Sequence, residues 1–463
     1  MVDVIAMILD AVLDKFIQRS PVTVMTRAVM ENVLAPAAID EIFERVAERQ
    51  YVRELLFSSV VDLVGLVVGK VHPSIHAAYQ RVKATLPVSL ASVYNKINAT
   101  EPAVITGLVR HTAEGMGSVI DEMGGRLPAL VPGYRVRILD GNHLASTERR
   151  LEPLRGSKAG PLPGFAIVVL EPERMLATQM IPCEDGHAQE RSLSNDILAL
   201  ATDKDLWIGD RNFCTTALLT GLAERGAFFA IRRHAAMTLT SAGTQRSCGR
   251  TETGAVFEQK MTLTDSGGAT LQLRLVTVHL DKVTRDGDRE VAILTNLPVK
   301  AASATSVADL YRKRWTLESM FLTMTQILEG EIETLGYPGA ALLGFGVALV
   351  SYNIYSTVQA ALRAEFGTER VQNDVSAYYI ADEVQGTMRG MEVAVESVLW
   401  ETFQSLSPKA LAKELRQYAR HVSLELFKKH PRGPKKPTTP RTRFADQPHV
   451  STARVLAGAK GMR

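Results

Sequence analysis

The feature that most constrains the fold is a series of short apolar segments between Pro132 and Arg233. The segments YRVRILD, FAIVVLE, MLATQMIP, LWIGD and AFFAIRR are rich in β-branched residues and bounded by turn signals, so each predicts a β-strand. Helical patterns at 188–202 and 215–225 separate the last three segments. Three successive strands predict an antiparallel meander, and the later alternation predicts βαβ crossovers. We therefore predict an α/β fold with a mixed sheet.

The regions on either side of these segments have a mainly helical pattern, in which apolar residues recur at spacings of three and four. A polar, strand-like stretch with the turns SAG, DSGG and DGD follows the last predicted strand, and helical periodicity resumes from about Ser306 to Glu333. The predicted organisation is a helical N-terminal region at 1–132, the first part of the core at 133–233, a β-rich insertion at 234–298, a helical completion of the core at 299–366, a helical C-terminal region at 367–427 and a basic, largely disordered tail at 428–463.

The composition is that of an ordinary globular protein, with 46% hydrophobic and 22% charged residues. The three cysteines lie far apart and form no CxxC pair, which argues against a disulfide framework and against a Cys-rich zinc module. The N-terminus contains acidic residues that a signal peptide would lack. The most apolar run, Gly339–Val350, is shorter than the roughly 20 residues that span a bilayer. We expect a soluble, cytoplasmic protein with no membrane segment.

The charges are nearly balanced, with 53 Lys and Arg against 50 Asp and Glu. This balance excludes a histone-like coat of positive charge, but it allows local basic clusters. The segment Lys428–Arg443 carries seven basic residues and no acid. Such clusters bind DNA phosphates by releasing counterions, although each one alone also fits a solvated surface. The clusters outside the tail that we predict to contact DNA are Arg149 with Arg150 and Arg232 with Arg233.

Three carboxylates stand where the predicted elements could bring them together. Asp140 and Asp210 each end a predicted strand, and Glu318 lies in the helical segment YRKRWTLESMF. Strand-terminal acids meet if their strands are neighbours, and Mg²⁺ neutralises such a cluster through carboxylate oxygens. Each residue also has a simpler explanation, as a hairpin turn for Asp140, a helix cap for Asp210 and an exposed helix charge for Glu318.

The helical segment around Glu318 has a distinctive face. Tyr311, Arg314 and Glu318 are spaced i, i+3 and i+7, which places them within about 60° of one another around a helix. Arginine binds phosphate in a bidentate way, and tyrosine can hydrogen-bond a phosphate oxygen or stack on a base. This face indicates contact with a nucleic-acid strand, and the alternative is a surface helix with an i,i+4 ion pair.

Together these segments resemble bacterial insertion-sequence DDE transposases of the IS-four group, which have an RNase H-like catalytic core. ILDGNHL resembles the first-aspartate block, WIGDRNFCT the second, and YRKRWTLESMF the signature Tyr-x2-Arg-x3-Glu-x6-Lys. The β-rich insertion before the glutamate is also typical of the group. The resemblance covers about residues 50–365 and implies an α/β fold, with an RNase H-like mixed-sheet core between helical N- and C-terminal regions.

The resemblance implies an enzyme that cleaves DNA at transposon ends and transfers the strands into target DNA. Asp140, Asp210 and Glu318 would be the catalytic, metal-binding residues and would hold two Mg²⁺ ions, for which Mn²⁺ could substitute. Arg314 would neutralise a phosphate near the scissile bond, and Tyr311 would position the strand end. The implied partners are double-stranded DNA, with its transposon ends bound by the helical N-terminal region, and a second copy of the chain in a homodimer on DNA.

Two departures from the group's pattern bear on this function. The motif lysine falls at Thr325, so Lys313 is our candidate substitute for contacting DNA phosphate. The three tryptophans, Trp207, Trp315 and Trp400, lie outside the insertion, so the sequence does not support cleavage through a DNA hairpin. Two other functions stay open: a catalytically decayed DNA-binding protein, and an RNase H-like nuclease without strand transfer.

Overall fold

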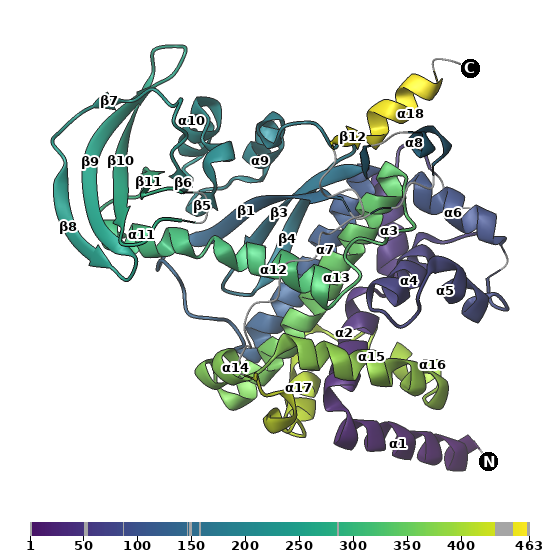
Figure 1. The fold of residues 1–463 in the computed structure, drawn as a ribbon. Helices are drawn as coiled ribbons and strands as arrows, with labels where there is room; N and C mark the ends of the chain where they lie inside the picture. The colour runs from purple at the N-terminus through teal and green to yellow at the C-terminus, as the bar shows by residue number, and fades with distance from the viewer. Residues whose placement is uncertain are drawn as a thin grey trace.

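The computed structural model describes residues 2–50, 54–86, 88–145, 147, 151–156, 159–284, 287–430 and 448–460. A large mixed β-sheet runs through the molecule, with helices packed on it (Figure 1). Its strands are β1 Arg135–Leu144, β3 Gly164–Glu171, β4 Leu176–Cys183, β5 Asp205–Gly209, β6 Phe228–Arg232, β7 Thr240–Ser241, β8 Arg246–Thr251, β9 Gly254–Thr264, β10 Thr270–Leu280 and β11 Glu290–Thr295. Their spatial order is β4-β3-β1-β5-β6-β11-β10-β9-β7, and β8 also pairs with β9.

The five strands expected from the apolar segments form one half of this sheet. β3 pairs antiparallel with β1 and β4 pairs antiparallel with β3, which is the predicted meander. β5 runs parallel to β1 and β6 runs parallel to β5, and the crossovers contain α9 (Ser194–Leu200) and α10 (Thr216–Glu224). The mixed sheet is confirmed, and it is consistent with the RNase H-like core that the resemblance implies.

The β-rich stretch after β6 continues the same sheet. β11 pairs antiparallel with β6, and β10 and β9 follow it in antiparallel order. The strand β8 and the longer strands β9 and β10 form the curved end of the sheet at the left of Figure 1. Because β11 is hydrogen-bonded to the core strand β6, the inserted strands are joined to the core by backbone pairing.

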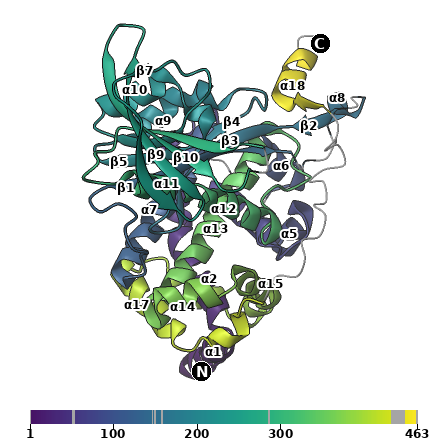
Figure 2. The same cartoon turned by 60° about the vertical axis from the view of Figure 1, so that its left-hand side comes forward.

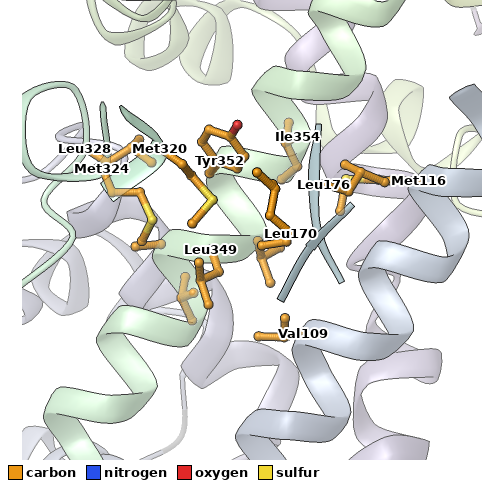
Figure 3. Packing of buried hydrophobic residues seen from close by; sticks show 14 of the residues in the cluster. Val109, Met116, Leu170, Leu176, Met320, Met324, Leu328, Leu349, Tyr352 and Ile354 are labelled. Atoms are coloured by element: carbon orange, nitrogen blue, oxygen red, sulfur yellow. The ribbon is translucent and has the colours of Figure 1, made fainter. Parts of the chain in front are cut away.

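Side chains of the core strands alternate between two apolar layers, as the two-residue period of a strand requires. On one face, Val136 and Ile138 belong to the cluster that includes α7 (Pro102–Met123) and α13 (Pro338–Phe366). On the other face, Trp207 packs in a cluster with residues of α9 and α10. Figure 3 shows the first cluster from close by, with the labelled residues Val109, Met116, Leu170, Leu176, Met320, Met324, Leu328, Leu349, Tyr352 and Ile354.

The helical N- and C-terminal regions are far apart in sequence but pack against each other. Their helices are α1 Val2–Arg19, α2 Pro21–Val33, α3 Pro36–Val46, α4 Phe57–Val68, α5 Ile75–Val82, α6 Leu90–Asn98, α14 Thr368–Asp374, α15 Ala377–Ala394, α16 Ser397–Glu401 and α17 Pro408–Ala419. α2 contacts α15, α16 and α17. Figures 1 and 2 both show α2, α15 and α17 together below the sheet.

The apolar run at Gly339–Val350 lies in α13, at the centre of the molecule. Among the described residues, α13 is the one unbroken helix long and apolar enough to cross a membrane, and 89% of its most apolar window is buried inside the protein. It packs against α4, α7, β3 and β4. This burial is that of a core helix.

The prediction of continuous helical structure from about Ser306 to Glu333 is wrong, because the segment forms two helices. α11 spans Ala304–Arg312 and α12 spans Trp315–Gln326. Between them, the amide of Lys313 donates to the Leu310 carbonyl, and the next amide likewise donates three residues back. This tighter hydrogen bonding, of the 3₁₀ type, makes the junction between the two helices.

The prediction of a largely disordered tail is wrong at its C-terminal end. β12 (His449–Ser451) pairs in parallel with β2 (Gly160–Leu162), and α18 (Thr452–Lys460) follows it. α18 packs against α8 (Glu152–Arg155). The short strand obtains backbone partners that the sequence of the tail alone does not reveal. The preceding basic residues, 431–447, lie outside the described residues.

Candidate active site

Asp140 and Asp210 lie at the same level of two neighbouring parallel strands. The last registered pair between β1 and β5 joins Ile138 to Ile208, and each aspartate comes two residues later. Our prediction that Asp140 ends its strand is wrong, because β1 continues to Leu144 through its pairing with β3. This continuation also excludes a hairpin turn at Asp140. Asp140 lies just beyond the end of the pairing between β1 and β5, whereas β1 is still paired with β3 at this position.

The Asp140 carboxyl group is largely buried, with 15% of its side chain exposed. Its Oδ1 atom accepts a hydrogen bond from the Gly141 amide at 3.0 Å, and its Oδ2 atom lies 3.1 Å from Nη1 of Arg314. Burial raises the pKa of Asp140 to about 7. Arg314 opposes this rise, whereas the charges of Asp210 and Glu190 add to it. Burial and these like charges disfavour the ionised form of the carboxyl group, and a bound cation would favour it.

Asp210 caps the short 3₁₀ turn Arg211–Phe213. Its Oδ1 atom accepts a hydrogen bond from the Asn212 amide at 2.8 Å. The capping role considered from the sequence is therefore present, but for this turn, since α10 is capped by Thr215. Capping holds the carboxylate in place and uses one of its oxygens, so the other remains available to a ligand.

Arg314 links the first and third carboxylates. Its Nη2 atom lies 2.6 Å from Oε1 of Glu318, and its Nη1 atom is the one that contacts Asp140. Arg314 and Glu318 form the i,i+4 ion pair that the alternative interpretation of this helix face proposed. However, only 16% of the Arg314 side chain is exposed, and it also reaches the sheet, so a surface ion pair does not describe it. α12 crosses β1 at this point, which brings the helix residues to the strand acid (Figure 1).

Tyr311 lies beside the same guanidinium although it belongs to the preceding helix. Burial raises the pKa of the Tyr311 phenol to about 12, and the charges of Arg314 and Arg232 partly offset this rise. The phenol thus keeps its proton and serves as a hydrogen-bonding group near neutral pH. The face predicted from the spacing is retained because the residues at the junction keep helical dihedral angles, φ −64° at Lys313 and φ −52° at Arg314.

A fourth carboxylate, Glu190, was missed from the sequence. It lies in the 3₁₀ turn Glu190–Leu193 that leads into α9, and its Oε2 atom accepts a hydrogen bond from Nδ2 of Asn212 at 3.1 Å. A side chain at Gly141 would collide with its carboxylate. Burial raises its pKa, and Asp210 adds to the rise. The sequence signal was the Asp-Gly pair, since a glycine there admits Glu190 beside the strand.

In the arrangement seen here, the three carboxylates Asp140, Asp210 and Glu318 fit a divalent cation only in part. Asp140 and Asp210 are neighbouring carboxylates of the hard-oxygen type that such cations bind, and the charge of Asp210 raises the pKa of Asp140. Glu318 is already paired with Arg314. Within the described residues, no group of three or more His, Cys, Asp or Glu side chains is arranged to hold a metal ion. Metal binding by all three acids therefore requires Arg314 to release Glu318.

Only some of the residues predicted to bind DNA lie close to the three carboxylates. Arg232 is close enough for its charge to act on Tyr311, and it is paired with Asp288 at 2.7 Å. Arg233 turns elsewhere, with its Nη2 atom 3.4 Å from the Met237 carbonyl.

Lys313 is exposed at the junction between α11 and α12, and it lines a separate cavity on the other side of α12. Thr325, at the position of the motif lysine, donates its hydroxyl hydrogen bond to carbonyls of its own helix. Arg149 and Arg150 lie outside the described residues. The structure therefore brings Arg232, Arg314 and Tyr311 together and leaves Arg233 and Lys313 apart from them.

One comparison with known proteins matches the part of the chain that contains this site. Residues 132–353 match the family model described as the transposase DDE domain. The match begins just before β1, ends within α13 and includes Asp140, Asp210 and Glu318. It spans slightly under half of the chain and supports a DDE transposase. No curated protein matches the chain.

Proposed function

We propose that this chain is a DDE transposase of the IS-four group, which cuts DNA at the ends of a mobile element and joins those ends to target DNA. The observation that carries the proposal is the convergence of Asp140 and Asp210 at one level of the sheet, with Arg314 joining Asp140 to Glu318. The three acids come from segments that the family match includes.

The chemistry has two phosphoryl-transfer steps. In the first, a water oxygen bonds to phosphorus and the bond to the 3′ oxygen breaks, which leaves a 3′-hydroxyl on the element and a 5′-phosphate on the flanking DNA. In the second, the oxygen of that hydroxyl bonds to a phosphorus of the target strand and the bond from this phosphorus to the target's 3′ oxygen breaks, which joins the element to the target's 5′ side and leaves a 3′-hydroxyl on the other side of the target cut. Divalent cations, Mg²⁺ or Mn²⁺, would supply activation of the attacking oxygen and stabilisation of the leaving oxygen. Asp140, Asp210 and Glu318 would hold them.

The neighbouring side chains position the DNA strand. Arg314 releases Glu318 and binds a phosphate oxygen instead. Its Nε atom favours this exchange, because the atom is buried and has no hydrogen-bond partner among the described residues. Tyr311 donates its phenolic hydrogen to the strand end, and Arg232 adds positive charge beside it. The helical N-terminal region, residues 1–132, reads the end sequence. Two copies of the chain pair two ends on DNA in the cytoplasm.

The test uses the full chain, Mg²⁺ and a DNA fragment that carries the inverted repeats flanking its gene. Wild-type protein is expected to cleave the repeat end and to join it to a target plasmid, and Asp210→Ala is expected to do neither. Asp196→Ala, an exposed acid on α9, is the matched control and should retain both activities.

The products separate the alternatives. Strand nicking without joined product would assign a nuclease that lacks strand transfer. Binding of the repeat ends with no metal-dependent nicking, under conditions where the protein is folded, would overturn the enzymatic proposal and leave a DNA-binding protein.

A further inference from the structure

Arg363 is a buried cation near the end of α13, and it has no carboxylate partner among the described residues. The residue is only 5% exposed. Its Nε atom donates to the Gly125 carbonyl at 3.0 Å, and its Nη2 atom has no hydrogen-bond partner among the described residues. Burial lowers the pKa of Arg363 to about 10, so it remains charged at neutral pH. Buried charges are costly unless they are paired.

Arg363 lines a cavity of about 710 Å³ between α12 and α13. Other lining residues on its α13 wall are Tyr352, Tyr355, Ser356 and Gln359, and Trp315 lies on its α12 wall. The α13 residues recur at helical spacing, so they form one continuous face of that helix. The cavity lining thus combines hydroxyl and amide groups, aromatic rings and a guanidinium that has no carboxylate partner among the described residues.

The acids that line the cavity do not neutralise Arg363. Glu252 lies 3.0 Å from one nitrogen of Arg312, and Asp309 lies 3.5 Å from another, so both acids are paired at the rim. With Lys313 also lining the cavity, its charged residues carry a net excess of positive charge. An anion is the ligand that completes such a site.

We propose that this cavity binds a phosphate group attached to a nucleoside, with Arg363 as the phosphate anchor. A guanidinium suits phosphate because its planar set of N–H donors matches two phosphate oxygens. The volume is that of a small-molecule site, larger than a bare phosphate requires, and Trp315, Tyr352 and Tyr355 offer faces for a base or sugar.

The phosphate belongs either to a DNA strand or to a free nucleotide, and these sources share the same chemistry. The proposal goes beyond DNA cleavage and does not depend on it, since binding here needs neither the three carboxylates nor a metal ion.

The experiment measures tryptophan emission of the full chain in EDTA. Trp315 is 53% exposed, whereas Trp207 and Trp400 are 0% and 3% exposed, so a ligand in the cavity changes mainly the emission of Trp315. The probes are inorganic phosphate, deoxyadenosine monophosphate, deoxyadenosine, and a short single strand with and without a 5′-phosphate. We expect saturable binding of the phosphorylated probes and none of deoxyadenosine.

Two variants test the anchor. Arg363→Gln should weaken binding of the phosphorylated probes by about tenfold or more. Gln359→Glu places a carboxylate one helical turn before Arg363, so it should pair with the guanidinium, raise the melting temperature without ligand and also abolish binding. Arg370→Gln, at an exposed position on α14, is the control and should bind like wild type.

The comparison of probes identifies the source. Tighter binding of the phosphorylated strand than of the mononucleotide would assign a DNA strand, and the reverse would assign a free nucleotide. Emission that no phosphorylated probe alters, or equal binding by the folded Gln359→Glu variant and wild type, would overturn the proposal. Either result would leave the cleavage assay with Asp210→Ala unaffected, so the two proposals fail separately.

Discussion

The Nη1 atom of Arg314 lies 3.1 Å from the Oδ2 atom of Asp140, although 174 positions separate the two residues in the chain. The same guanidinium contacts Glu318 at 2.6 Å. One cation therefore connects a core strand to the helix that crosses it and compensates two of the carboxylates. Without it, the largely buried Asp140 would keep only the like charges of Asp210 and Glu190 near it.

Arg314→Gln should impair both activity and stability. Asp140 would remain buried without its cation, so we expect the metal-free protein to lose about 1–3 kcal/mol in its free energy of unfolding. Cleavage of repeat-end DNA should fall about 100-fold or more, because the proposed function assigns the charge of Arg314 to the transferred phosphate. Denaturant unfolding in EDTA and a cleavage assay measure these effects. Arg416→Gln, exposed on α17, serves as the control; equal behaviour of the two variants would contradict the role of Arg314.

The raised pKa of Asp140 should make the metal-free protein less stable as pH rises. A carboxyl group with a pKa of 3.8 when unfolded and about 7 when folded contributes its full stabilisation below about pH 4, and this is lost as pH rises through 7. Asp140→Asn removes the titration. Between pH 4 and pH 8, its free energy of unfolding should therefore rise by about 2–4 kcal/mol relative to wild type.

Urea unfolding in EDTA at the two pH values checks this expectation for Asp140. Asp196→Asn, on the exposed side of α9, should follow the wild-type pH dependence. The explanation fails if Asp140→Asn and wild type change in parallel with pH.

Glu190 is expected to position Asp210 through Asn212. The Asn212 side chain donates to Glu190 while its backbone amide donates to Asp210. Glu190→Ala should reduce cleavage about 10- to 100-fold, as loss of a supporting hydrogen bond to a metal-binding group does. Glu190→Gln keeps an acceptor for Asn212 and should retain cleavage within about threefold of wild type. If Gln is as impaired as Ala, the negative charge of Glu190 matters and the positioning role is wrong.

The C-terminal helix α18 should open more often after the loss of one ion pair. Arg454 lies 2.6 Å from Asp185, and Ser451 donates to the same carboxylate at 2.7 Å. Burial alone would raise the pKa of Asp185, but these hydrogen bonds lower it to about 2. The pair is partly exposed, so Arg454→Gln should cost about 0.5–1 kcal/mol and speed hydrogen exchange at residues 449–460 by about two- to fivefold.

Acid should have the same effect on this helix. A carboxylate whose pKa is lowered by folding stabilises above its unfolded value of 3.8, and this contribution is lost as pH falls towards 2. Peptide-level hydrogen exchange at pH 5 and pH 3 tests both expectations. Arg420→Gln, which disrupts a pair with Glu365 elsewhere, should leave exchange at 449–460 unchanged.

The core strands and crossover helices could be predicted because their signals are local. Alternation of apolar residues, turn residues and helical spacing each depend on a few neighbours, and these patterns led to β1, β3, β4, β5, β6, α9 and α10. The end of β1 was misjudged because its continuation past Asp140 depends on hydrogen bonds to β3, a strand more than twenty residues away. The strand and helix at 448–460 were likewise missed, because β12 pairs with β2, which is distant in sequence.

By itself, the sequence determined which residues could act: two acids after apolar strand segments, and one helical face with Tyr311, Arg314 and Glu318. Only the tertiary structure decided how they meet. Parallel pairing of β1 with β5 sets Asp140 level with Asp210, and the crossing of α12 over β1 brings Arg314 to the sheet. Burial at that crossing raises the pKa of Asp140, and folding of the turn before α9 adds Glu190. These effects depend on solvent exclusion and on distances across the chain, which no local pattern encodes.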